Sequence, residues 1–269
     1  MKFKIIFIIF NIISFFSLLF AGFLSFSVFR SDYFIFFWRL YWYYPAAFLL
    51  FVSILDIYFF DNWRFFQLLE TEDWDATLKY LEKMVFNRKK IKRKYIKIIT
   101  NLYLMKSALD KMTRLEDFLR KNRPRYILLF PLQFGIPYLL SNNPARMEEY
   151  YAGLLGEKAL KERMWILWDY SFSLVLQKKN KEAGENFLYI IKSSREPILT
   201  LLSCYFLHTF GDFEMEMSKE IADGVRKLKK NFSRKMWDDE IEKSRNNIQA
   251  VIISRIVKEA SEWMFAYSL

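Results

Sequence analysis

Two long apolar runs dominate the first sixty positions of the chain. Residues 5–29 contain no charged side chain, and residues 33–60 contain only Arg39 and Asp56 as charged residues. About 20 apolar residues, each rising 1.5 Å along a helix, cross a hydrocarbon core of about 30 Å. The pattern therefore predicts a transmembrane hairpin with spans at about 5–29 and 40–60.

The amino terminus leaves two questions open, cleavage and orientation. Lys2 and Lys4 precede the first run, as basic residues do in a signal peptide. We favour an uncleaved span for two reasons. The run is longer than the hydrophobic region of an ordinary signal peptide, and residues 19–22 do not form a cleavage site followed by polar residues. The basic amino terminus favours a cytoplasmic location for the beginning of the chain. Two spans return the chain to the same side, so this orientation predicts a cytoplasmic domain. Acidic residues within 61–75 oppose that orientation, so a periplasmic domain stays open.

Beyond residue 60, apolar positions recur at helical spacing between polar turns. A recurring feature is a polar turn followed by a helix that opens with a small or apolar residue. These opening residues return about every 32 to 39 positions, at Ala76, Leu115, Met147, Ala183 and Met215. With only 7 Gly and 6 Pro in the chain, the spacing predicts an all-α fold of helices with short connections.

In this period the chain resembles the tetratricopeptide repeat (TPR) family, whose helix-turn-helix unit is about 34 residues long. The best-matching unit spans residues 164–197, with the small Ala183, the aromatic Phe187 and the closing Pro197. Ser171 stands where the family has a Gly, and most units lack the closing Pro. The resemblance implies stacked helix pairs in a curved solenoid, with a concave surface on which partners dock. An irregular helical bundle is the alternative.

The expected organisation has three parts. Residues 1–60 form the transmembrane hairpin, residues 61–236 form degenerate TPR-like helical repeats, and residues 237–269 form one long C-terminal helix. We expect that helix to cap the repeat stack or to lie in its groove.

A net charge of +11 directs attention to the densest basic run. Near a membrane such a run attracts anionic headgroups by about 1 kcal/mol per basic residue, and it could equally bind an acidic protein. We expect no nucleic acid partner, because the sequence offers no element that reads bases. A solvated turn between helices is the simpler interpretation of the same run. The candidate surface consists of Arg88, Lys89, Lys90, Lys92, Arg93, Lys94 and Lys97.

The sequence contains few residues that could form a catalytic or metal-binding site. Cys204 and His208 are the only residues of their types, so an intramolecular disulfide or an ordinary zinc site is excluded. Their i, i+4 spacing is the only nucleophile–base geometry, but apolar neighbours favour a buried structural pair. Lys97 and Asn101, one helical turn apart, match a carboxylate-binding pattern of TPR modules that later units do not repeat. We expect no enzyme activity, no cofactor and no metal.

The sequence favours a membrane-anchored TPR-like scaffold of a bacterial-type inner membrane, integral to it and binding protein partners of an envelope complex. In this architecture the chain resembles the membrane-linked TPR proteins of the spirochaete flagellar motor collar. By this analogy it could be a structural component of such a motor, which would place the domain in the periplasm. The alternative is a transporter accessory or a small intramembrane enzyme that uses Asp56 and Arg39. Partner identity and oligomeric state are left open.

Overall fold

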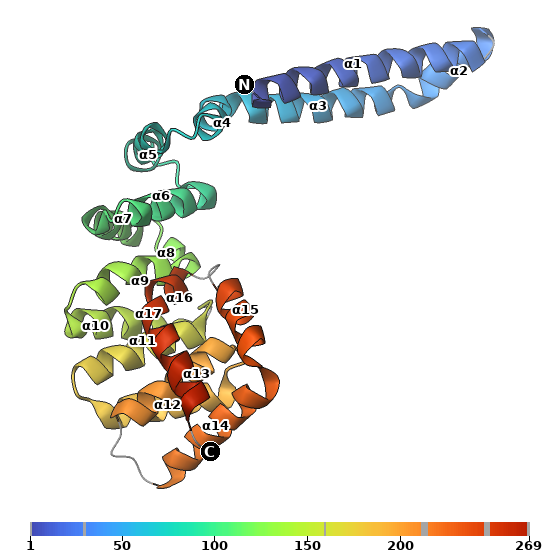
Figure 1. Ribbon diagram of the computed structural model, residues 1–269. Helices are drawn as coiled ribbons and strands as arrows, with labels where there is room; N and C mark the ends of the chain where they lie inside the picture. Colours follow the sequence, from blue (N-terminus) through green and yellow to red (C-terminus); the bar gives the residue numbers. More distant parts are fainter. Residues whose placement is uncertain (1, 29–30, 159, 211–214, 245–247, 268–269) are drawn as a thin grey trace. The chain divides into compact units, whose positions relative to one another are not determined.

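The structure is a computed structural model that describes residues 2–28, 31–158, 160–210, 215–244 and 248–267. All regular secondary structure in these ranges is helical, which confirms the predicted all-α class for the described part of the chain. The chain divides into two compact units, Met1–Lys90 and Ile91–Leu269 (Figure 1). The domain borders expected from the sequence, at 60/61 and 236/237, remain predictions.

The first unit holds the two apolar helices. Its elements are α1 (Lys2–Val28), α2 (Ser31–Tyr41), α3 (Tyr43–Asp61), α4 (Trp63–Glu70), α5 (Trp74–Glu82) and the π-helical turn η1 (Lys83–Asn87). Over Phe3–Val28 and Tyr43–Asp61, α1 and α3 are long and apolar enough to cross a membrane. These helices correspond to the two expected spans.

Helices α1 and α3 lie side by side (Figure 1). The Phe7 ring stacks on the Phe59 ring at a centroid distance of 4.4 Å. Most of their large apolar side chains point away from this contact and are exposed, for example Phe16 at 62% and Ile57 at 69%. The hairpin therefore presents apolar side chains outward.

The second apolar run of the sequence is not one helix. Helix α2 ends at Tyr41, and α3 begins two residues later. The break follows from Pro45, which has no N–H to donate to the Tyr41 carbonyl four residues earlier but is tolerated in the first turn of α3. The side chain of Trp38, at the end of α2, donates from Nε1 to Ser25 Oγ on α1 at 3.0 Å.

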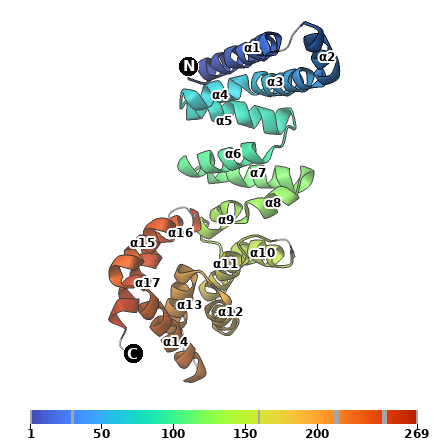
Figure 2. The same cartoon turned by 90° about the vertical axis from the view of Figure 1, so that its right-hand side faces the viewer.

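The second unit stacks consecutive helices. Its elements are α6 (Arg93–Met105), α7 (Leu109–Asn122), α8 (Arg125–Leu129), α9 (Pro131–Leu140), α10 (Pro144–Leu155), α11 (Arg163–Leu176), α12 (Asn180–Ser193), α13 (Pro197–Phe210), α14 (Met215–Asn231), α15 (Arg234–Ser244), α16 (Ile248–Ile252) and α17 (Ser254–Ala266). From α9 to α14 each helix packs against the next, while α9 contacts α11, α11 contacts α13 and α12 contacts α14 (Figures 1 and 2). We call α9, α11 and α13 the first layer, and α10, α12 and α14 the second.

The periodic residues of the sequence follow this layering. Met147, Ala183 and Met215 lie on α10, α12 and α14, the three helices of the second layer. Met147 and Ala183 are both 1% exposed, because the helices of successive pairs meet there. Ser171, at the position of the TPR glycine, is fully buried on α11 and donates to the Leu167 carbonyl at 2.7 Å.

The C-terminal segment differs from the expected single long helix. It consists of α15, α16 and α17. Helix α15 is described as far as Ser244, whose hydroxyl donates to the Ile241 carbonyl at 2.6 Å. Ile253 alone separates α16 from α17.

Candidate functional site

The predicted basic surface is divided between the two units. Arg88, Lys89 and Lys90 belong to the first unit and are exposed, whereas Lys92, Arg93, Lys94 and Lys97 belong to the second. Lys90 lies 3.9 Å from the Asp61 carboxylate. The Lys92 and Lys94 ammonium groups lie 5.7 and 5.5 Å from the centroid of the Tyr95 ring. Binding by this run remains a prediction.

The first layer of the second unit is covered by the chain's own C-terminal helices. Helix α16 packs on α9, and α17 packs on α13 and α14 (Figure 2). The Lys229 ammonium donates to the Tyr267 carbonyl at 2.7 Å, and Trp237 Nε1 donates to Ser261 Oγ at 2.9 Å. The face expected to receive partners along α9 to α13 is therefore occupied by α16 and α17.

A buried polar contact joins this segment to the layer. Gln249 of α16 donates from Nε2 to Asp169 Oδ1 of α11 at 2.5 Å, and Asp169 is fully buried. Burial raises the pKa of the Asp169 carboxyl well above its ordinary value, although the neighbouring Tyr151 hydroxyl and the hydrogen bond from Gln249 oppose the shift. The folded protein therefore favours the protonated form of Asp169 more than the unfolded chain does.

The cysteine and histidine singled out in the sequence do not form a pair. Cys204 is fully buried, with Sγ against Gly224 of α14, and burial raises the pKa of its thiol to about 12. His208 is exposed, and its ring lies 5.1 Å from the Trp263 ring and 5.5 Å from the Tyr267 ring. The expected buried pair is correct for Cys204 and wrong for His208, because Cys204 packs against α14 whereas the His208 ring is only partly covered by two aromatic rings.

Asp56 and Arg39, the residues of the alternative function, have separate surroundings. Asn11 of α1 donates from Nδ2 to Asp56 Oδ1 of α3 at 3.1 Å, so the carboxylate links the two apolar helices. Arg39 is exposed on α2. The structure gives Asp56 a packing role within the hairpin.

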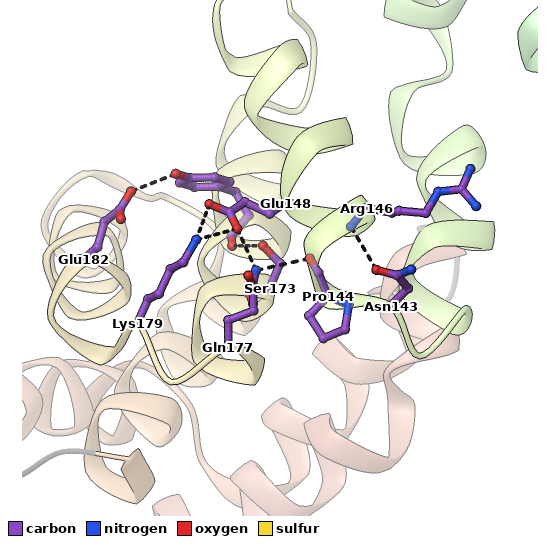
Figure 3. A network of polar contacts seen from close by, with 9 residues as sticks. Asn143, Pro144, Arg146, Glu148, Ser173, Gln177, Lys179 and Glu182 are labelled. Carbon is purple, nitrogen blue, oxygen red and sulfur yellow. Dashed lines mark hydrogen bonds and ion pairs between the residues drawn. The ribbon is translucent and has the colours of Figure 1, made fainter.

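Polar side chains join successive helix pairs in the second unit (Figure 3). The Lys179 ammonium lies 2.7 Å from the Glu148 carboxylate, and Gln177 donates to the same carboxylate at 2.7 Å. The turn between α11 and α12 thus holds a residue of α10. These contacts lower the pKa of Glu148 below its ordinary value, with the Lys179 hydrogen bond the main cause. The polar turn before α12 therefore binds the first turns of α10, where Gln177 also donates to the Pro144 carbonyl at 3.3 Å.

A cavity of about 850 Å³ lies among α7, α8, α9 and α10. Basic side chains line it together with two tyrosines, a patch of aliphatic residues and two glutamates. We call it the arginine pocket, and its lining is Arg120, Pro124, Arg125, Ile127, Leu128, Leu129, Tyr138, Arg146, Glu149, Tyr150, Gly153, Leu154, Glu157 and Lys161.

A buried carboxylate organises one wall of the arginine pocket. Glu116 of α7 is 1% exposed and accepts from Arg120 at 2.7 Å (Nε) and 2.6 Å (Nη2) through one oxygen. Its other oxygen accepts from the Tyr138 hydroxyl at 2.9 Å. Burial raises the pKa of Glu116, while both hydrogen-bond partners lower it. Burial and the neighbouring Glu116 also raise the pKa of Tyr138 well above its ordinary value.

Two tyrosines form the platform on which the arginines lie. The Tyr138 and Tyr150 rings stack at 4.5 Å with an interplanar angle of 16°. The Arg120 guanidinium lies 5.8 Å from the Tyr150 centroid, and the Arg146 guanidinium lies 5.9 Å from the Tyr138 centroid. Each pair is within cation–π distance.

Local sequence explains how α10 presents Arg146. Asn143 precedes the helix and accepts from the Arg146 backbone N–H at 3.1 Å (Figure 3), while Pro144 occupies the first helical turn.

The arginine pocket was not predicted from the sequence. The Glu116–Arg120 i, i+4 pair was visible, but its tyrosine partners come from other helices.

The arginine pocket lies in a part of the chain that matches a known protein family. The family described as "Uncharacterised Treponema protein" matches residues 111–266, which include the arginine pocket and the covered first layer. An "Uncharacterized protein" of Treponema pallidum (strain Nichols) is 22% identical over 239 residues, covering 84% of this chain and 76% of the relative. No solved structure matches the chain.

Proposed function

We propose that this chain, which belongs to the family of uncharacterised Treponema proteins, is a membrane-anchored scaffold of TPR-like helical repeats that binds other proteins. The observation that carries the proposal is the α1/α3 hairpin, whose large apolar side chains are exposed along both helices. A contiguous apolar surface of this length is unfavourable in water and is matched to a bilayer.

The second unit supports the scaffold part of the proposal. From α9 to α14 its helices pack against their neighbours along the sequence, and three of the periodic residues, Met147, Ala183 and Met215, lie in one layer. Stacked pairs of this kind give extended surfaces for protein partners. The arginine pocket stays open on such a surface, while α16 and α17 cover the first layer.

Extraction of native membranes tests the anchor. An integral scaffold should remain in the pellet after carbonate or high-salt washing and should require detergent for release. Its partners should be recovered with it after cross-linking. Release by salt alone would contradict the two spans, and a turnover number for the purified protein would end the scaffold proposal.

The side of the membrane can be tested with an added thiol. Cys204 is buried and therefore a poor target for labelling, whereas Gly153 is exposed and has open space for a side chain. Labelling of Gly153→Cys by an impermeant maleimide in intact cells would place the second unit in the periplasm. A role in a flagellar motor collar needs that result, and a family named for Treponema agrees with the spirochaete setting of the analogy.

The alternative function within the bilayer has a separate test. Asp56→Asn should leave a scaffold functional, because an amide can still accept from Asn11. Loss of function in a folded, membrane-retained variant would favour the intramembrane acid.

A further inference from the structure

We propose that the arginine pocket binds an acidic, partly apolar segment of a protein partner. This inference rests on the proposed function and names the place and chemistry of one of its contacts. The pocket volume of about 850 Å³ suits a few side chains of a peptide, since ligand sites commonly measure about 300–1,000 Å³.

The first argument is that the cationic wall is prepared before a partner arrives. Arg120 is fixed by two hydrogen bonds to the buried Glu116, and its face rests near the Tyr150 ring. The Tyr150 hydroxyl is itself held by the Pro131 carbonyl at 2.7 Å. Fixing these side chains in advance lowers the conformational entropy lost on binding.

The second argument is the positive charge that remains in the lining. Glu116 neutralises Arg120, but the structure gives Arg125, Arg146 and Lys161 no ion pair with any described residue. Guanidinium groups bind carboxylates with well-defined geometry. A partner that brings carboxylates would therefore complement this wall.

The third argument separates a peptide from a compact anion. Glu149 and Glu157 also line the pocket, and their charges oppose a phosphate or a nucleic acid backbone. Aliphatic side chains of Ile127, Leu128 and Leu154 complete the lining. A peptide whose carboxylates and apolar side chains are spaced apart can contact the cations and the aliphatic patch while avoiding the glutamates.

The chain offers variants that test the pocket without removing its buried parts. Gly153 lines the pocket and a Cβ there would meet nothing within 4 Å, so Gly153→Trp should fill the space. Ala152 is its exposed neighbour outside the lining, and Ala152→Trp is the matched control. Arg146→Glu reverses an exposed pocket charge, with Arg226→Glu on α14 as its control.

The test is fluorescence anisotropy of the full chain in detergent micelles. The probe is a labelled peptide of alternating Glu and Leu, compared with the same peptide carrying Lys in place of Glu. The acidic peptide should bind more tightly than the basic one. Gly153→Trp and Arg146→Glu should each weaken binding by about tenfold or more, while both controls should stay within about twofold.

Three results would overturn the inference. One is absence of binding of the acidic peptide to the unaltered chain, and another is unchanged affinity in both pocket variants while circular dichroism shows them folded. The third is equal competition by inorganic phosphate or by vesicles with anionic headgroups, which would show that the pocket takes any anion. Membrane retention and cross-linked partners are scored separately: if both persist in Gly153→Trp when one of these three results is found, the scaffold stays in place and only this site is rejected.

Discussion

At the scale of single residues, close contacts inside the second unit leave little room for change. Gly135 of α9 is buried, and a Cβ there would lie 2.4 Å from the hydroxyl oxygen of Tyr151. Tyr151 is fully buried beside Asp169, so its ring has no free direction in which to move. The sequence did not predict that these three residues are close together, because they lie on three different helices.

Gly135→Ala should therefore destabilise the protein by about 1–3 kcal/mol through overpacking. The measurement is urea denaturation of the full chain in detergent, monitored by circular dichroism. Gly153→Ala is the matched control, since its added methyl group meets open space and replaces glycine within a helix, which stabilises by up to about 1 kcal/mol. Equal midpoints for both variants would mean that α9 and α10 do not meet as described.

Asp169→Asn should change how stability depends on pH. The folded pKa of Asp169 is raised, whereas an unfolded Asp titrates near about 3.9. Above that pH the unfolded chain has released a proton that the folded chain still holds. Stability is therefore greatest below the unfolded pKa and falls, by about 1.4 kcal/mol per pH unit, until the folded pKa is reached.

Asparagine cannot ionise, so the variant should lack this loss. Its free energy of unfolding relative to the unaltered chain should rise as the pH increases above about 4, where the unfolded Asp ionises. The amide oxygen of the variant can still accept from Gln249. Asp238→Asn, on the exposed surface of α15, should show no such trend. Parallel pH curves for Asp169→Asn and the unaltered chain would contradict a raised pKa of Asp169 in the folded protein.

At the scale of elements, periodicity was the most informative signal in the sequence. It predicted helices throughout and placed Met147 and Ala183 at buried positions of alternate helices. It did not predict the break between α2 and α3 or the separation of α16 from α17 at Ile253. The arginine pocket was equally hidden, because α7, α9 and α10 bring its residues together only after packing.

Ala183→Trp tests the layering of the elements. Ala183 lies at 1% exposure on α12, where neighbouring helices leave no space for an indole ring. We expect a loss of about 1–3 kcal/mol in the free energy of unfolding. Ala152→Trp on the exposed side of α10 should cost much less, and a similar loss for both would show that burial is not the cause.

At the scale of the whole molecule, net charge and membrane attachment act together. Replacing Arg88, Lys89 and Lys90 by Glu should weaken binding to anionic vesicles, measured by co-sedimentation. The expected loss of binding free energy is about 1 kcal/mol for each basic residue near the surface. High salt should reduce the difference in binding between the variant and the unaltered chain. The reason is that the Debye screening length falls from about 10 Å at 0.1 M to about 3 Å at 1 M ionic strength. Neutral vesicles are the lipid control.

A protein control separates local from total charge. Lys181, Arg195 and Lys227 are exposed on the second unit, and reversing them changes the net charge by the same amount. Equal weakening by both triple variants would assign the effect to net charge and remove the special role of the basic run.

The position of that run has a further consequence for proteolysis. Residues 88–92 connect η1 to α6 without regular helix, and Arg88, Lys89 and Lys90 are exposed at the junction of the two compact units. Exposed, irregular segments are preferred sites of nicking, and trypsin cleaves after basic residues. Brief digestion of native membranes should therefore release a helical fragment beginning near Ile91, while the apolar hairpin stays with the lipid.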